Sequence, residues 1–189
     1  MADFVLSSGS ICRPHRSPFG NFPVKTGLLS TGVSSAAIVI GRRLTLDWTG
    51  STTAGLVIAS THAIGGAPFM LVGIAAMGAS GSTAATRNEI QYWEANPMVE
   101  FKAATKGATL QSSNIGQRKK LTRDSTLDIE YVDLTASTAA DWRVIITGLV
   151  DAEGDSGGYV SFRFLSRLQD NIGSSIAQTS TTPLLAFFS

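Results

Sequence analysis

Alternation of apolar and polar side chains near the C-terminus limits most strongly what this chain can fold into. Segments 142–150 and 159–165 both alternate, and in the second Val160, Phe162 and Phe164 share one face. Because successive side chains of a strand point to opposite faces, this pattern predicts half-buried antiparallel strands. No long segment repeats apolar residues at helical spacing, so the chain is expected to be mainly β, as an antiparallel β-sandwich or a small β-barrel.

Turn signals divide the rest of the chain into further short segments. The acidic, glycine-rich residues 151–157 predict the loop of a hairpin that joins the two alternating strands. In segment 88–101 a short helical turn competes with a strand, and Pro97 ends any helix by Ala95. Other strands are expected at residues 36–40, 44–48, 56–59, 68–76 and 126–134.

The two ends of the chain differ from its centre. Residues 1–30 contain prolines, glycines and isolated apolar residues that follow neither a helical nor a strand period, which predicts an extended N-terminal arm. A single β-domain is expected over 31–189, with an apolar tail at 183–189 that either contacts a partner or docks on the chain's own core. The candidate partner-binding side chains of the arm and tail are Phe4, Ile11, Phe19, Phe22, Leu185, Phe187 and Phe188.

Charged residues are scarce in this chain. They make up 15% of it, against roughly 25% in typical soluble domains. The 15 Lys and Arg and 14 Asp and Glu leave a net charge of +1, which argues against a nucleic-acid-binding protein that works through bulk charge. No charge lies between residues 48 and 86, so part of this surface is expected to be covered by neighbouring molecules, where buried charge would be costly.

The same uncharged stretch is long enough to raise the question of a membrane span. Its apolar part, residues 54–79, could cross a bilayer as a helix. However, Ser, Thr and His at 60–62 and Gly-Gly-Ala-Pro at 65–68 interrupt it, which is typical of strands and turns. The N-terminus lacks a basic segment followed by an apolar run, so neither a membrane partner nor a secretory signal is expected.

One basic cluster stands out, in residues 117–123. Two interpretations stay open for it: a solvated loop that enters a strand, or a contact with an acidic partner surface. For the second interpretation, the candidate partner-binding residues are Arg118, Lys119 and Lys120.

The segment Gly154–Gly158 (GDSGG) is similar to the nucleophile loop of chymotrypsin-like serine proteases, with His62 and Asp128 in the matching order. Only 27 residues separate Asp128 from Ser156, whereas the strands between them in a double-barrel protease need about 40 or more. We therefore expect a hairpin loop and no enzyme, with a small serine hydrolase as the remote alternative.

Few residues are suited to holding a metal or cofactor. The chain has two histidines and one cysteine, Cys12, so neither a disulfide nor a zinc site built on histidine or cysteine is expected. The carboxylates of Asp151, Glu153 and Asp155 are hard ligands but lack the spacing of a calcium loop. We expect no metal and no cofactor.

The stretch Leu44–Val57 (LTLDWTGSTTAGLV), followed by Pro68–Ala75 (PFMLVGIA), resembles small head decoration, or cement, proteins of tailed bacteriophages. Those proteins often show a strand, a turn rich in Thr and Gly, and then a strand of small residues. Residues 101–109 and 142–165 are similar in character to the β-domains of virion structural proteins, so the resemblance covers about residues 20–165.

The resemblance implies a non-enzymatic virion protein that binds the assembled lattice of major capsid protein and stabilises it. It also implies a homo-oligomer, often a trimer, that is made in the host cytoplasm and resides on the head surface. Another virion component, such as a head fibre, a tail protein or a receptor-binding adhesin domain, stays open as an alternative.

Overall fold

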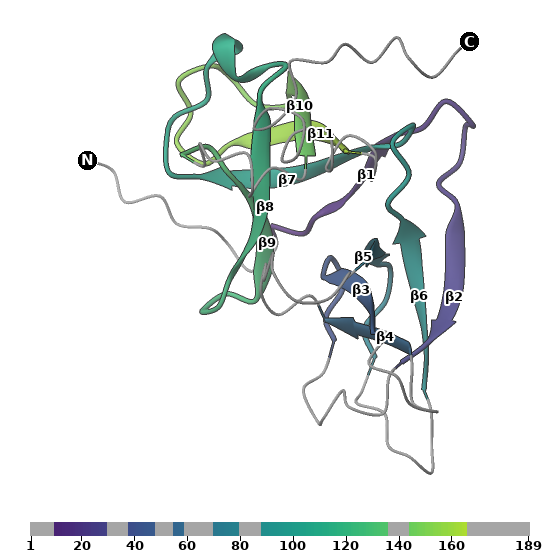
Figure 1. The fold of residues 1–189 in the computed structure, drawn as a ribbon. Coiled ribbons are helices and arrows are strands. Elements are labelled where there is room, and N and C mark those ends of the chain that lie inside the picture. The colour runs from purple at the N-terminus through teal and green to yellow at the C-terminus, as the bar shows by residue number, and fades with distance from the viewer. Residues whose placement is uncertain are drawn as a thin grey trace, which may run out of the picture.

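The computed structural model describes residues 10–29, 38–47, 55–58, 70–79, 88–135 and 144–165, and it is mainly β, as predicted. A small closed barrel lies at the top of Figure 1 and a second, five-stranded sheet lies below it. Among the described residues the helical element is one short 3-10 turn, Ser112–Asn114, and no helix is long and apolar enough to cross a membrane. The strands are β1 (Arg13–Arg16), β2 (Val24–Leu28), β3 (Arg43–Asp47), β4 (Gly55–Ile58), β5 (Met70–Ala75), β6 (Glu89–Glu94), β7 (Glu100–Lys106), β8 (Arg118–Asp124), β9 (Ile129–Asp133), β10 (Val144–Leu149) and β11 (Tyr159–Phe164).

Five strands form the barrel in the order β7-β11-β10-β8-β9. All their pairings are antiparallel except the last, in which β9 pairs with β7 in parallel at Thr105↔Val132 and Lys106↔Asp133 and so closes the barrel. β1 pairs with residues 100–102 of β7, just before the residues of β7 that pair with β9. The prediction of a small barrel is confirmed, and the predicted hairpin around residues 151–157 joins β10 to β11.

The alternation that predicted the last strand is realised in the barrel core. Val160, Phe162 and Phe164 are all buried there. Phe101 from β7 joins them, with its ring centroid 4.9 Å from that of Phe164 and 6.1 Å from that of Phe162. Aromatic rings at these separations add to the stability that their burial provides.

The second sheet has the order β2-β6-β5-β3-β4. Its smaller core includes Leu29, Leu44 and Ile90. Gly73 lies where β5 passes close to β6, because a Cβ at this position would collide with the backbone of Trp93. A residue without a side chain is therefore required for these two strands to pair.

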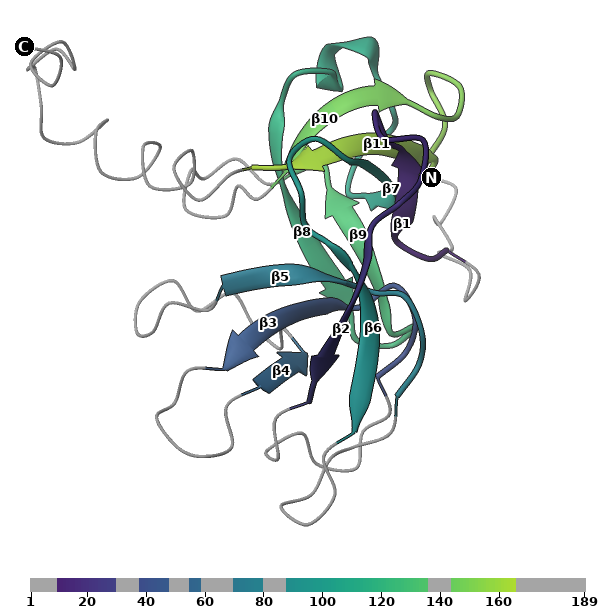
Figure 2. The same ribbon diagram turned by 90° about the vertical axis from the view of Figure 1, so that its right-hand side faces the viewer.

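Two connections join the sheet to the barrel, as Figure 2 shows. One runs from β1 to β2 and the other from β6 to β7, and they lie side by side because β1 pairs with β7 and β2 with β6. Residues 10–29, which the sequence placed in the N-terminal arm, thus supply an edge strand to each unit and lie against the chain's own β7 and β6. The domain boundary at residue 30 stays a prediction.

Four described strands were absent from the sequence-based expectations: β1, β2, β7 and β8. One interpretation of residues 117–123 is a loop that enters a strand; the strand is present, and it begins at Arg118, since Arg118–Asp124 form β8 between β10 and β9. The basic side chains obscured the strand pattern in the sequence.

Candidate functional site

The GDSGG segment forms the tip of the β10–β11 hairpin. Leu110 anchors it through two backbone hydrogen bonds, donating its N–H to the carbonyl of Asp155 (2.9 Å) and accepting from the N–H of Gly154 (2.8 Å). Gly154 and Gly157 adopt positive φ angles of 94° and 74°. The glycines therefore serve the tight turn of a hairpin, as predicted.

Among the described residues, Ser156 and Asp128 are not brought together into a catalytic triad. The Asp128 carboxylate accepts from the side chains of Arg42 and Arg123, so it is already engaged by two cations. Register separates the two residues further: Ile145 pairs with Arg118 at the start of β8, whereas Asp128 follows the end of that strand. Ser156 and Asp128 consequently lie at opposite ends of β8, and His62 lies outside the described residues.

The carboxylates of the same loop take part in the turn. Asp151 accepts from the backbone N–H of Tyr159 (2.8 Å), and Glu153 accepts from the backbone N–H of Ser112 (3.0 Å). Within the part of the chain that the structure describes, no three His, Cys, Asp or Glu residues form a group that could hold a metal ion. These carboxylates give the loop its negative charge and part of its shape.

The candidate partner-binding residues fall in three places. Ile11 is partly buried, and its side chain occupies the space where a Cβ at Gly41 would stand, so it contacts the chain itself. Phe19 and Phe22 are exposed on the β1–β2 connection. Outside the described residues lie Phe4, Leu185, Phe187 and Phe188.

The three basic candidates lie on β8 but do not act as one patch. Arg118 pairs with Ile145 of β10, and Lys120 pairs with Asp133 of β9. Between them Lys119 reaches the end of the barrel, where its ammonium donates to the carbonyl of Leu134 at 2.6 Å. Because successive side chains of a strand point to opposite faces, the three basic residues that are adjacent in the sequence do not lie on one face of β8.

An exposed apolar strip runs along the connections between the two units. Phe19 is 58% exposed and Met98 is 53% exposed, and Phe22 and Val24 are exposed as well. These four residues, called the apolar edge below, lie on or next to the β1–β2 and β6–β7 connections, which run together. Large apolar side chains clustered on a surface are typical of a contact with another macromolecule.

A row of charged side chains crosses the outer surface of the barrel next to this edge. Arg16 of β1 pairs with Glu100 of β7, and the Arg163 guanidinium of β11 lies 3.1 Å from the Glu100 carboxylate. Arg163 also pairs with Ile145 of β10, which pairs with Arg118 of β8. One row thus carries three arginines and a single carboxylate.

A second row of outward-facing side chains lies two residues further along β7, at Lys102. Arg13 pairs with Lys102, which pairs with Ser161, and the Lys102 ammonium lies 5.6 Å above the ring of Tyr159. The intervening Phe101 is buried in the barrel core, so the charged side chains on either side of it point outward. The four residues Arg13, Arg16, Lys102 and Arg163 are called the basic face below.

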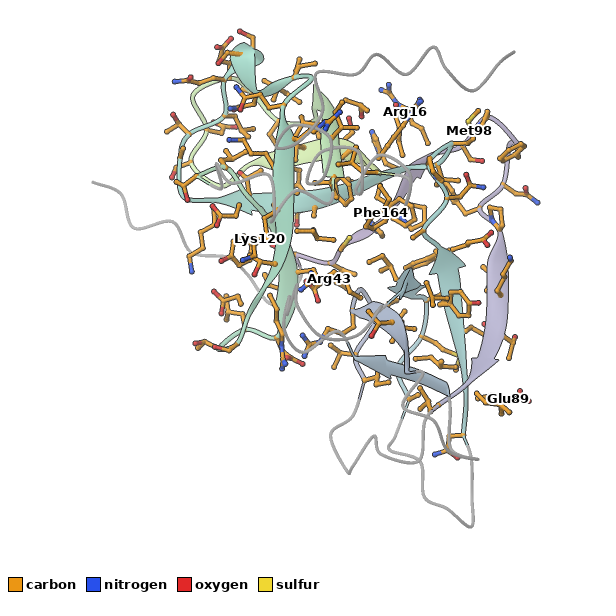
Figure 3. All side chains as sticks on the ribbon, in the orientation of Figure 1. Arg16, Arg43, Glu89, Met98, Lys120 and Phe164 are labelled. Carbon is orange, nitrogen blue, oxygen red and sulfur yellow. The ribbon has the colours of Figure 1, made fainter. Side chains whose placement is uncertain are left out.

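His15 lies within this basic environment. Partial burial lowers the pKa of His15, and the nearby charges of Arg16 and Lys102 lower it further, while Glu100 acts in the opposite direction. The charges that act on His15 are thus mostly positive, in line with the cations of the basic face. Figure 3 shows Arg16 and Met98 near each other, so the basic face and the apolar edge adjoin.

A buried charge cluster joins the barrel to the five-stranded sheet. Arg42 and Glu130 are each 1% exposed. The Nε of Arg43 lies 2.7 Å from Oε2 of Glu130, and an NH group of Arg43 donates to the carbonyl of Leu121 at 2.6 Å. Arg42 reaches the Asp128 carboxylate in the β8–β9 turn. In Figure 3 Arg43 lies between the two units.

Burial governs the ionisation of this cluster. It raises the pKa of Glu130, and the adjacent arginines, Arg43 foremost, counteract the rise. Burial also raises the pKa of the Cys12 thiol, with the Glu130 charge adding to the effect. Arg42, Arg43 and Glu130 are therefore buried where the barrel meets the sheet, whereas Asp128 at the end of the cluster is partly exposed.

Sequence reasoning missed this cluster, although one signal was present. Glu130 and Val132 share a face of β9, and both are buried. An acidic residue on the inward face of an alternating strand requires a buried cation as its partner. The Arg42-Arg43 pair supplies it from 87 residues away in the sequence.

Comparisons with protein-family models, with curated proteins and with solved structures found no match for this chain. The functional argument therefore depends on the surfaces described above.

Proposed function

We propose that this protein is a non-enzymatic structural component of a virion that binds an assembled capsid lattice on the head surface, in the manner of a decoration protein. The observation that carries the proposal is the apolar edge, in which Phe19, Phe22, Val24 and Met98 are exposed together. Burying such side chains against a partner stabilises the complex by about 25 cal/mol for each Å² removed from water.

The composition of this surface supports a protein partner. Large apolar side chains form its centre and charged residues such as Arg16 lie beside it, which is the usual arrangement in protein interfaces. A homo-oligomer, with a trimer favoured, belongs to the same proposal. Such an oligomer would present several copies of the apolar edge to a repeating lattice, so that several weak contacts together give tight binding.

Co-sedimentation with purified capsids tests the proposal. We expect the full chain to pellet with the particles at a fixed ratio to the shell protein. Replacing Phe19 and Met98 by Ser is expected to weaken binding at least about tenfold, because exposed aromatic and Met anchors account for much of the energy of an interface.

Met77→Ser is the matched control, since Met77 is 44% exposed after β5 and lies outside the apolar edge. Equal binding by the Phe19→Ser/Met98→Ser variant and the unaltered chain would contradict the role of the edge. Removing residues 1–9 tests the rest of the arm separately. A deletion that extends to residue 20 would also remove β1 and the buried Cys12, and it would destabilise the barrel.

A further inference from the structure

We propose that a second copy of this chain seats its acidic hairpin loop, residues 151–155, on the basic face of the first, so that copies associate head to tail. This inference rests on the homo-oligomer of the proposed function and names the two surfaces that form it. Association between copies and binding to the capsid are separate properties, and either one can occur without the other.

The basic face carries an excess of positive charge that the same face does not neutralise. Its four cations come from β1, β7 and β11, and the cross-strand rows place one carboxylate, that of Glu100, among them. One NH group of Arg163 donates to the Glu100 carboxylate, while Arg13 and Arg16 are exposed on β1. A partner that presents several carboxylates would complement this charge.

The hairpin loop has the matching chemistry. Asp151, Glu153 and Asp155 place three carboxylates within five residues that include no Lys or Arg, and residues 151–156 are all exposed. The hydrogen bonds from Gly154 to Leu110 and from Leu110 to Asp155 hold the loop in one shape. A loop that is ordered before binding loses little conformational entropy when it docks.

Exposed apolar side chains flank both surfaces. Val150 precedes the loop, and Ile115 follows the turn of Ser112, whose N–H binds Glu153. Met98 and Phe19 adjoin the basic face on the other side of the contact. Each surface therefore combines complementary charge with apolar area, as specific interfaces do.

The chain's own loop does not occupy its own basic face. The loop adjoins Tyr159 at the start of β11, beside Lys102, whereas Arg163 lies near the end of that strand and pairs with Glu100. Four residues along a strand span about 13 Å. Loop and basic face are different surfaces, so a docked pair still has one unused loop and one unused basic face. Further copies can add there, and they close into a ring when the rotation between neighbouring copies permits.

Light scattering after size exclusion tests the pairing, supported by sedimentation equilibrium to measure the dissociation constant. We expect an oligomer of the full chain at about 50 mM NaCl that shifts toward monomer at about 500 mM, where exposed charges are screened. Arg16→Glu is expected to raise the dissociation constant at least about tenfold, because it sets like charges against each other. Asp155→Lys is expected to do the same.

The double variant Arg16→Glu/Asp155→Lys restores attraction between loop and face, so its dissociation constant is expected to return to within about threefold of the original. Lys25→Glu is the matched control. It makes the same change in charge on an edge strand, beside Glu94 rather than Glu100, and it lies on the other sheet. We expect it to leave association unchanged.

A monomer at low salt, or equal association by Arg16→Glu and Lys25→Glu, would overturn the inference. Loss in both single variants without rescue in the double variant would also overturn it. Arg13→Glu changes the same face and provides the same test if Arg16→Glu unfolds the protein by circular dichroism. Capsid pelleting of each variant keeps the two proposals apart, since a salt-sensitive oligomer that ignores capsids contradicts only the proposed function.

Discussion

The barrel and the five-stranded sheet differ in how they handle the edges of their strands. The barrel closes through the parallel β7–β9 pair, whereas the described strands of the sheet end at β2 and β4. The barrel core is also the larger of the two among the described residues, with an aromatic centre of Phe101, Phe162 and Phe164. From this difference we expect the barrel to be the more self-sufficient unit and the sheet to depend on its attachment.

That attachment is made largely of charged groups. Arg42 and Arg43 from the sheet meet Asp128 and Glu130 from the barrel, and most of these groups are buried. A buried ion pair stabilises little compared with an apolar contact of the same volume, but a broken one is costly. We infer that the junction mainly sets the orientation of the two units, and with it the alignment of the apolar edge.

Core substitutions should separate the two units most clearly. Phe162→Ala is expected to lower the free energy of unfolding by about 3–5 kcal/mol, since it opens a cavity among three packed rings. Ile90→Ala in the sheet is expected to cost about 2–5 kcal/mol but to act locally. Denaturant unfolding measures the first effect, and hydrogen exchange locates both.

In the Ile90→Ala variant we expect amide protection to fall in β2 and β6 while β10 and β11 keep theirs. Equal loss of protection in both units would show that they unfold together. The comparison between a self-sufficient barrel and a dependent sheet would then fail.

A substitution in the junction should have an intermediate effect. Arg43→Met removes the charge that lies 2.7 Å from Glu130 and keeps most of the side-chain volume. Leaving a buried carboxylate without this partner is expected to cost about 3 kcal/mol. Because a destabilised junction opens more often, the buried Cys12 thiol should then react with a thiol reagent at least about tenfold faster under native conditions.

The double variant Arg43→Met/Glu130→Leu is the control for this prediction. It removes both charges, so most of the lost stability is expected to return, and Cys12 should again react slowly. A double variant as unstable as the single one would mean that the junction depends on the shape of these side chains and not on their charge.

The smallest effect is expected at the β8–β9 turn. The pKa of Asp124 lies below its ordinary value of 3.8 because its carboxylate accepts from the N–H of Leu127 and from the ammonium of Lys106. A lowered native pKa means that this stabilisation is present above about pH 4 and is lost as the pH falls through the native pKa. Asp124→Asn keeps the acceptor for Leu127 but cannot titrate.

Thermal unfolding between about pH 5 and about pH 2 should therefore show a slightly weaker acid destabilisation in Asp124→Asn than in the unaltered chain. The difference between the two curves isolates this turn from the other carboxylates, Glu130 included. Parallel curves across this range would show that the Asp124 contacts add nothing to the stability of the barrel.

The sequence predicted the elements whose pattern is local. Alternation in 159–165 identified β11 and its buried face, and the glycine-rich acidic segment identified the hairpin before it. β1, β2, β7 and β8 escaped prediction because prolines, small residues or basic side chains interrupt their pattern. The parallel β7–β9 pair escaped as well, since parallel and antiparallel strands share the same period of two.

The candidate surfaces divide in the same way. Phe19 and Phe22 were identified from the sequence as apolar residues without an obvious partner in the chain, and they are exposed. Met98 and Val24 join them only through the pairing of distant strands. The basic face was not foreseen at all, because Arg16, Lys102 and Arg163 are far apart along the chain and become neighbours through cross-strand register.

The sequence by itself determined that this chain is a sparsely charged β-protein with a hairpin near its C-terminus, because side-chain alternation and turn residues act over a few positions. Only the tertiary structure decided which charges meet. Burial raises the pKa of Glu130, and only folding brings Arg43 close enough to counteract that rise. Cross-strand register alone turns scattered arginines into one face.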